Sequence, residues 1–87
     1  LRENNSISSF NLYPNPFNNQ LTISSENQLD EIAVFDLTGK QLIFMSQINS
    51  NSIILDLSTI TSGSYFILIK DNLGNLSTEK IIKSANK

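Results

Sequence analysis

Hydrophobic residues recur along this chain in short runs and at alternate positions, and no stretch keeps the spacing of a helix. Clusters of Gly, Asn, Asp and Ser separate the runs, a pattern typical of all-β proteins. The pattern predicts seven strands, over residues 9–13, 20–24, 31–36, 41–46, 52–56, 64–70 and 75–83. Seven short strands at this spacing favour a small antiparallel β-sandwich.

Two five-residue segments predict tight hairpin turns. DLTGK at residues 36–40 and DNLGN at residues 71–75 each place a glycine where a type I turn followed by a bulge needs a positive φ. We therefore expect Gly39 and Gly74 to close two well-defined hairpins. The polar segment at residues 49–52 predicts a looser connection whose register the sequence does not fix.

Alternation within the predicted strands indicates which side chains enter the core. Leu21 and Ile23 share one face of their strand, and residues 53, 55 and 57 are expected to point inward. In the strand over residues 31–36, either residues 32 and 34 or residues 33, 35 and 37 form the inner face. Residues 65–69 are apolar on both faces, so we expect this strand at the centre of a sheet or with its outer face covered.

Length and composition indicate one small domain. The chain has 87 residues, of which 39% are hydrophobic, which excludes wholesale disorder. It begins with Leu1 rather than Met, and a polar stretch follows at residues 3–6. We interpret residues 1–9 as a linker remnant from an upstream part of a larger protein, and residues 10–87 as the folded domain.

Charge and missing residue types exclude several functions. The net charge of −2 provides no basic stripe, so we expect no nucleic-acid partner. The absence of cysteine excludes disulfides and thiolate metal sites, and the absence of histidine removes the commonest general base and metal ligand. No apolar run reaches the roughly 20 residues that a membrane-spanning helix needs.

The remaining polar residues do not form a catalytic pattern. The eight carboxylates are scattered, the serines and threonines have no evident activating base, and three glycines do not form a phosphate-binding loop. Asp36, Asp56, Asp71 and Asn72 offer oxygen ligands for calcium, but no Asp-x-Asp-x-Asp spacing is present, and turn roles explain them. We predict a non-enzymatic domain without a cofactor or bound metal.

The segment LYPNPFN at residues 12–18 places two prolines close to the first strand. Proline removes a backbone donor and restricts the residue before it to extended geometry. We therefore interpret the two prolines as the terminus of an extended edge segment. Leu12 and Phe17, on either side of them, are expected to anchor the segment to the core.

Two features in the last third of the chain have both structural and functional interpretations. The strand Lys80-Ile81-Ile82-Lys83 carries lysines that either protect a sheet edge from unwanted pairing or form a basic handle for a receptor. Gly63 allows a tight entry into the preceding strand. Tyr65 is expected to bury its ring while its hydroxyl reaches a loop carbonyl.

Four segments, taken together, resemble a known family. They are LYPNPFN at residues 12–18, IAVFDLTGKQL at 32–42, DLSTITSGSYFILI at 56–69 and STEKIIK at 77–83. In this order and spacing they resemble the type A C-terminal sorting domain of the type IX secretion system, also called the Por secretion system. The resemblance covers residues 12–83. It implies a small immunoglobulin-like β-sandwich at the C-terminus of large secreted proteins of Bacteroidetes-type bacteria.

The resemblance also implies a function. Such a domain is a secretion address, present in the periplasm in transit, for a cargo in the same chain. An outer-membrane type IX translocon and a shuttle protein recognise it there. A sortase then usually removes it, and the cargo ends at the cell surface or is secreted.

The family pattern implies recognition residues, and no catalytic ones. Its Pro-Asn-Pro element, Gly-x-Tyr element and terminal basic strand match the candidates Pro14, Asn15, Pro16, Gly63, Tyr65, Lys80, Ile81, Ile82 and Lys83, with Lys87 added as a further terminal lysine. Residues 84–87 extend past the point where family members tend to stop. Either Lys83 or Lys87 can therefore be the terminal basic contact.

Three other functions remain as alternatives. An immunoglobulin-like carbohydrate- or cell-surface-binding module of a secreted enzyme or adhesin usually needs exposed aromatic platforms, but the chain has no Trp, and Tyr13 and Tyr65 have structural roles available. A purely structural spacer is the second alternative. A metal-assisted enzyme is the third and the least supported.

Overall fold

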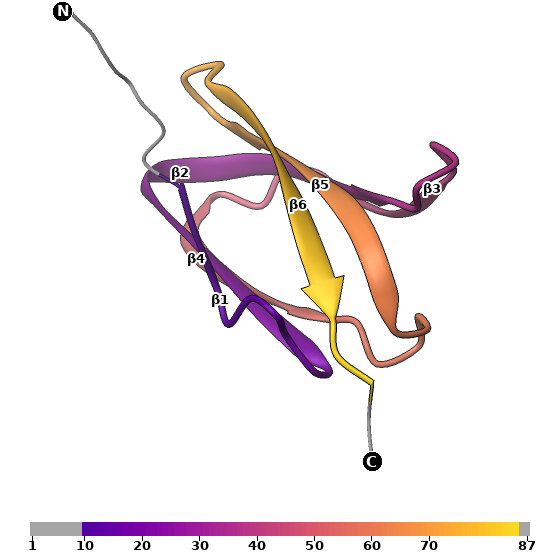
Figure 1. The fold of residues 1–87 in the computed structure, drawn as a ribbon. Coiled ribbons are helices and arrows are strands. Elements are labelled where there is room, and N and C mark those ends of the chain that lie inside the picture. The colour runs from indigo at the N-terminus through magenta and orange to yellow at the C-terminus, as the bar shows by residue number, and fades with distance from the viewer. Residues whose placement is uncertain (1–9, 86–87) are drawn as a thin grey trace, which may run out of the picture.

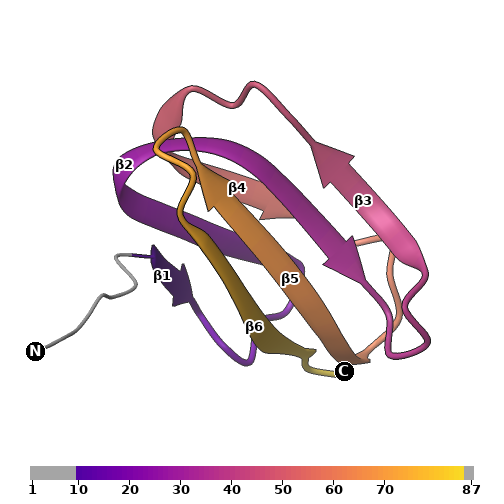
Figure 2. The ribbon, with the colours of Figure 1, turned by 90° about the horizontal axis from the view of Figure 1, so that it is seen from above.

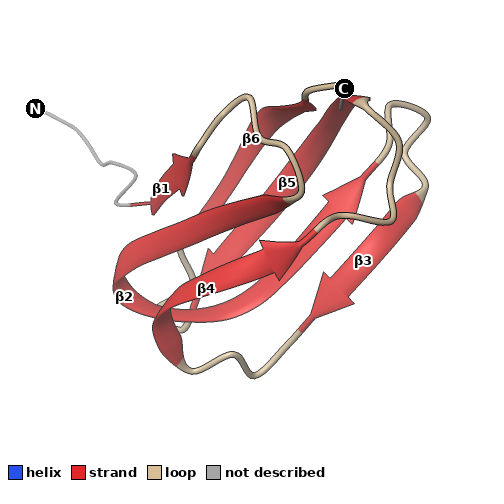
Figure 3. Cartoon of the chain, turned by 90° about the horizontal axis from the view of Figure 1, so that it is seen from below, coloured by secondary structure: helices blue, strands red, loops and turns tan. Residues whose placement is uncertain are grey.

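One long strand organises the molecule. The computed structural model describes residues 10–85, which form six strands and no helix (Figures 1 and 3). The strands are β1 (Phe10–Tyr13), β2 (Gln20–Phe35), β3 (Gln41–Met45), β4 (Ser50–Asp56), β5 (Gly63–Asp71) and β6 (Leu76–Lys83). The predicted all-β class and the antiparallel pairing are confirmed. No helix in this part of the chain could cross a membrane.

The sheet curls because β2 belongs to both of its layers. Residues 20–25 of β2 pair with β1 and β4, and residues 31–35 pair with β3 and β5. Between these two arms, Leu29 is the register partner of both Ser50 in β4 and Asp71 in β5. β6 then pairs with β5 at the edge. The first layer is therefore β1–β2–β4 and the second is β3–β2–β5–β6, with β2 turning back between them (Figure 2). Counting the two arms of β2 separately gives the seven predicted strands.

The predicted gap between residues 24 and 31 is instead the bend of β2. Its polar residues favour a turn in isolation, but neighbouring segments supply partners for its backbone. The Asn51 side chain donates to the carbonyls of Ser25 and Glu26, at 3.3 and 3.0 Å. The backbone of Asn49 donates to Leu29 O at 2.8 Å, and the Leu29 side chain is fully buried. The segment therefore stays extended and carries the strand from one layer to the other.

The core lies between the two layers. The first arm of β2 contributes Leu21 and Ile23, and the second contributes Ile32 and Val34, which settles the inner face of that arm. The complete buried cluster consists of Phe17, Leu21, Ile23, Leu29, Ile32, Val34, Leu55, Leu57, Tyr65, Ile67, Ile69 and Ile81. Both layers thus contribute alternate residues, as expected for a sandwich. The prediction that residues 65–69 form a central strand is also confirmed, because β5 lies between β2 and β6.

The β2–β3 turn is closed by its first residue. Asp36 Oδ1 accepts hydrogen bonds from the backbone of Thr38 at 2.9 Å, from the Thr38 hydroxyl at 2.6 Å and from the backbone of Lys40 at 3.0 Å. These bonds lower the pKa of the Asp36 carboxyl, the Thr38 side chain first and the Lys40 backbone second. Gly39 has a φ of 92°, as predicted.

The β5–β6 turn repeats this geometry around a buried carboxylate. Asp71 Oδ1 accepts from the backbones of Leu73 and Asn75, at 3.0 and 2.9 Å, and Gly74 has a φ of 90°. Asp71 Oδ2 also accepts from the side chains of Asn75, at 2.9 Å, and Asn27, at 3.1 Å. Burial opposes ionisation of Asp71, but these donors outweigh it, so its pKa lies below the ordinary value of 3.8.

A candidate recognition site at the C-terminal strand

The Pro-Asn-Pro element lies against the outer edge of β6. β1 ends at Tyr13, and both Tyr13–Pro14 and Asn15–Pro16 are cis peptide bonds. Asn15 faces the backbone of β6 between them: its Oδ1 accepts from the backbone of Ile82 at 3.1 Å, and its Nδ2 donates to Lys80 O at 3.3 Å. The Asn15 side chain thus pairs with the edge as a neighbouring strand residue would. The prolines come after the strand, as the sequence predicted for a strand terminus.

Phe17 continues the same contact and anchors it to the core. Its backbone N–H donates to Ile82 O at 2.9 Å, and its carbonyl accepts from the backbone of Ser84 at 2.7 Å. Its ring is fully buried, as the sequence predicted for an anchor. Asn15 and Phe17 therefore cover the C-terminal half of the β6 edge. The edge is closed here by a loop of the chain as well as by charge.

Lys83 is buried and holds a loop. Only 5% of it is exposed, and its Nζ donates to the carbonyls of Leu57 and Ile60, each at 2.7 Å. These two carbonyls belong to the connection between β4 and β5. Hydrogen bonds from Ser58, followed by the positive charge of Lys83, lower the pKa of Asp56 beside this connection. The Lys83 ammonium therefore joins the last strand to the segment before β5.

Gly63 and Tyr65 lie beside Lys83 and complete the same end of the molecule. Gly63 begins β5 with a φ of 144° and is the register partner of Lys83. Tyr65 is the register partner of Ile81, and both are buried. The Tyr65 hydroxyl donates to Thr61 O and lies 3.2 Å from the Thr61 hydroxyl. The predicted bond from this hydroxyl to a loop carbonyl is confirmed.

The structure thus brings nine of the ten predicted residues to one end of the sandwich, around the C-terminal half of β6. Tyr65, Ile81 and Lys83 point inward, whereas Pro14, Asn15, Pro16, Lys80 and Ile82 are exposed. Gly63 is exposed at the start of β5. Lys87 lies outside the described residues. Sequence reasoning missed the partners Leu57, Ile60 and Thr61, because each acts through its backbone carbonyl, which no residue type signals.

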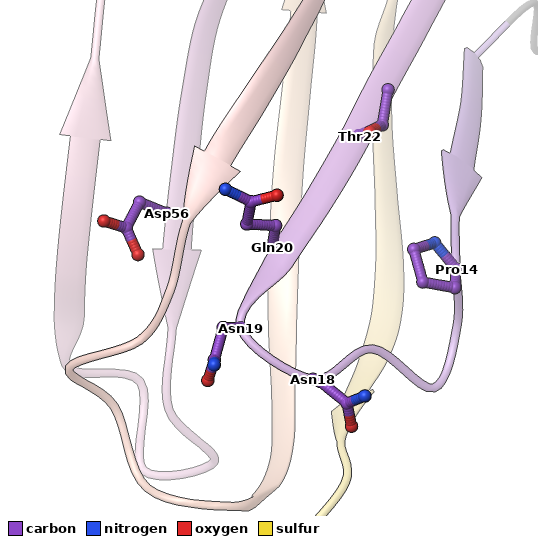
Figure 4. A pocket seen from close by; sticks show the side chains of 6 residues that line it. All are labelled: Pro14, Asn18, Asn19, Gln20, Thr22 and Asp56. Atoms are coloured by element: carbon purple, nitrogen blue, oxygen red, sulfur yellow. The ribbon is translucent and has the colours of Figure 1, made fainter.

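A shallow polar pocket of about 490 Å³ lies next to this site (Figure 4). It is lined by Pro14, Asn18, Asn19, Gln20, Thr22 and Asp56. None of these side chains is aromatic, so the pocket lacks the stacking platform that a carbohydrate module usually needs. Within residues 10–85, no group of three or more His, Cys, Asp or Glu side chains is placed to hold a metal ion.

The comparison with protein families identifies the family of this chain. The family described as the secretion system C-terminal sorting domain matches residues 11–84, a range that includes both the Pro-Asn-Pro loop and the whole of β6. The chain belongs to this sorting-domain family. Members of the family serve as C-terminal signals of type IX secretion, and the family is non-catalytic. The sorting domain is thus part of a larger cargo protein that interacts with type IX machinery and is exported.

Solved structures support the fold of this sorting domain. It is similar to the crystal structure of CopC from Methylosinus trichosporium OB3b, with a TM-score of 0.57 and 14% sequence identity. The similarity covers 93% of this chain and 97% of the other. At this identity the similarity shows the fold alone. No curated protein sequence matches the chain.

Proposed function

We propose that the outer-membrane type IX translocon and its shuttle protein recognise this sorting domain in the periplasm by the composite surface that the Pro-Asn-Pro loop forms with β6. The observation that carries this proposal is the pair of hydrogen bonds between Asn15 and the β6 backbone at Lys80 and Ile82. They join two segments that lie 65 and 67 positions apart in the chain. A translocon that binds this surface therefore recognises the folded domain, and this recognition does not depend on the cargo that precedes the domain.

The candidate residues divide into two roles in this proposal. Pro14, Pro16, Lys80 and Ile82 contact the machinery, because their side chains are exposed on the composite surface. The buried candidates stabilise the fold beneath that surface. Lys83 donates hydrogen bonds to the loop before β5, and Tyr65 packs against Ile81 across the strand pair. Lys87, four residues after Lys83, is proposed as an additional basic contact.

The proposal also includes the later steps of secretion. A sortase cleaves the domain at or before residues 1–9, and the cargo stays on the cell surface or is released. This places the domain in the periplasm in transit and at the surface only until cleavage. The domain itself performs no catalysis and needs no cofactor.

A reporter fusion tests the function. A periplasmic reporter carrying this chain at its C-terminus is expected to reach the cell surface or medium in cells with a working type IX translocon. The same reporter without the chain, or with an unrelated β-sandwich in its place, is expected to stay in the periplasm. Delivery of the unrelated-sandwich fusion would contradict the proposal, because the domain would then be a replaceable spacer.

Point variants test the recognition surface separately from folding. Replacing Pro14 and Pro16 together with Ala, or Ile82 with Ser, is expected to reduce delivery of the reporter. Ile54→Ser, at an exposed position of the other layer, is the matched control. Thermal melts of the purified domains show whether the loss follows stability. Unchanged delivery by stable proline-loop and Ile82 variants would contradict this choice of surface.

A further inference from the structure

The two outer faces of the sandwich differ in polarity. In the first layer, Leu21, Ile23 and Leu55 point into the core, so the residues between them and their register partners point outward. The outward positions are Asn11, Tyr13, Gln20, Thr22, Ser24, Ser52, Ile54 and Asp56. Only Tyr13 and Ile54 among them are large and apolar. This face has the composition expected of a solvated sheet surface.

The outer face of the second layer is apolar instead. Because Ile32, Val34, Tyr65, Ile67 and Ile69 point inward, the alternate residues face out. The outward apolar residues, named here the phenylalanine face, are Ala33, Phe35, Phe44, Phe66, Leu68, Leu76 and Ile82. Phe44 is 52% exposed, Phe66 39% and Ile82 42%.

The phenylalanine face is contiguous across the strands. Ala33 is the register partner of Phe44 on one side and of Leu68 on the other. In the next outward row Phe35 is the partner of Phe66. Single exposed apolar residues are ordinary, but a contiguous apolar patch that spans several strands marks an interaction site.

The charges around the phenylalanine face leave one lysine, Lys80, without a carboxylate opposite it. Lys80 is the register partner of Phe66, and Lys70 lies in the row beyond Leu68, opposite Glu31. The face thus carries two lysines and one glutamate, on a chain whose net charge is −2. The outer face of the first layer carries Asp56 and no lysine.

These charges indicate which occupant fits. A second copy docked face to face would bury the Lys80 of each copy without a free carboxylate from the other, because Glu31 already lies opposite Lys70. An unpaired charge buried at an interface is unfavourable. A membrane fits poorly because the phenylalanines are half-buried side chains within strands and only two lysines would attract anionic lipid, at about 1 kcal/mol each. An apolar protein surface with carboxylates at its rim matches both the centre and the rim of the face.

We propose that the phenylalanine face docks on a protein component of the type IX machinery, through an apolar surface rimmed by carboxylates. This inference rests on the proposed sorting function and adds a second contact to it. The face extends across β3, β2, β5 and β6, and it shares Ile82 with the composite surface described above. Its far end at Phe44 lies on β3, at the opposite edge of this layer from β6. A partner that contacts both surfaces would cover the β6 edge and the outer face of the second layer.

Substitutions at the far end of the face test the proposal without touching the proline loop. Phe44→Asp places a negative charge on the edge strand β3, and Lys70→Gln removes one attractive charge. Ile54→Asp, at 60% exposure on the other outer face, is the matched control. The readout is the amount of identified translocon subunits that co-purify with the reporter fusion from solubilised outer membranes, together with export of the reporter and the thermal melt of each variant.

Phe44→Asp is expected to lower translocon binding about tenfold, which corresponds to about 1.4 kcal/mol, while Ile54→Asp leaves it unchanged. Lys70→Gln is expected to lower binding less and to weaken its dependence on salt. Phe44→Asp also lowers binding if it unfolds the domain, so Lys70→Gln provides a second test. Translocon binding that keeps its strength and its salt dependence in Lys70→Gln would overturn the proposal.

Other outcomes separate this proposal from the sorting function. Export that requires the domain but is unchanged by Phe44→Asp and Lys70→Gln would overturn the docking face and leave the sorting function intact. Export that requires no domain would overturn both. If the wild-type chain binds phosphatidylglycerol vesicles and Phe44→Asp does not, the occupant of the face is a membrane. If the wild-type chain forms a dimer in solution and Phe44→Asp does not, the occupant is a second copy. Either outcome would overturn the proposal of a protein partner from the machinery.

Discussion

The two hairpin turns share a local design but differ in where they lie. Each begins with an aspartate whose Oδ1 accepts from the backbones two and four residues later, and each has a glycine at the fourth position with a φ close to 90°. Asp36 is partly exposed and its other donor is the neighbouring Thr38 hydroxyl. Asp71 is fully buried and accepts an additional bond from Asn27, 44 residues away.

The difference shows that the same turn motif gives the same backbone conformation in both hairpins. It does not determine how much the aspartate contributes to the free energy of unfolding. In the β2–β3 turn the aspartate orders only its own hairpin. In the β5–β6 turn the same residue type joins the hairpin to the bend of β2, and its removal leaves several part-buried donors without their acceptor. The following predictions test this contrast, from the largest expected effect to the smallest.

Asp71→Ala is expected to lower the free energy of unfolding by about 3 kcal/mol, because the fully buried Asp71 carboxylate is the acceptor of four part-buried hydrogen bonds, from Asn27, Leu73 and Asn75. Asp36→Ala, the matched substitution in the exposed turn, is expected to have a much smaller effect. Chemical denaturation of both variants measures the difference. Equal losses would show that the turn geometry alone sets the contribution of the aspartate.

Stability is expected to fall in acid, in part through Asp71. Its pKa is lower in the folded chain than its ordinary value of 3.8, so its contribution is complete above about pH 4 and is lost as the pH falls through the folded pKa. Asp36 and Asp56 shift in the same direction. Denaturation at several pH values should show a flatter acid decline in Asp71→Asn than in the unchanged protein. An identical decline in both would contradict the assignment.

Gly39→Ala and Gly74→Ala are expected to cost about the same, roughly 1–2 kcal/mol each, because both replace a glycine at a φ near 90°. At either glycine, an added Cβ would have no atom within 4 Å, so the cost comes from backbone conformation alone. Thermal or chemical denaturation of the pair checks this. A clearly larger loss for Gly74→Ala would mean that the turn held by the buried Asp71 cannot relax as the β2–β3 turn does.

Asn27→Ala is expected to lower the free energy of unfolding by about 1 kcal/mol, since it removes one bond to a charged, buried acceptor. Asn72→Ala is the control: Asn72 lies in the same region, but its side chain makes an exposed 3.3 Å contact with Gln28. Comparable losses in the two variants would show that the contact with Asp71 adds nothing to an ordinary surface bond.

The sequence predicted the features that local chemistry controls. Gly39, Gly74 and the Tyr65 hydroxyl are placed as expected, because turn conformation and the need to satisfy a buried phenol are properties of short segments. The alternation of Leu55 and Leu57 likewise predicted their burial.

Features that depend on distant partners could not be predicted. The segment over residues 25–30 looks like a loop until the side chain of Asn51 satisfies its carbonyls. Lys83 looks like a surface charge until the carbonyls of Leu57 and Ile60 surround its ammonium. Asn15 has the composition of a turn residue, and only the folded chain shows that it pairs with β6. In each case a polar group from another part of the chain decides the role.

The bend of β2 also has a consequence for cooperativity. Because one continuous strand supplies the centre of both layers, neither layer can lose this strand without exposing the inner face of the other. The domain has no half that could remain folded by itself as an independent subunit. We therefore expect a signal built on such a strand to unfold in a single cooperative transition, so that the secretion machinery meets it either folded or unfolded.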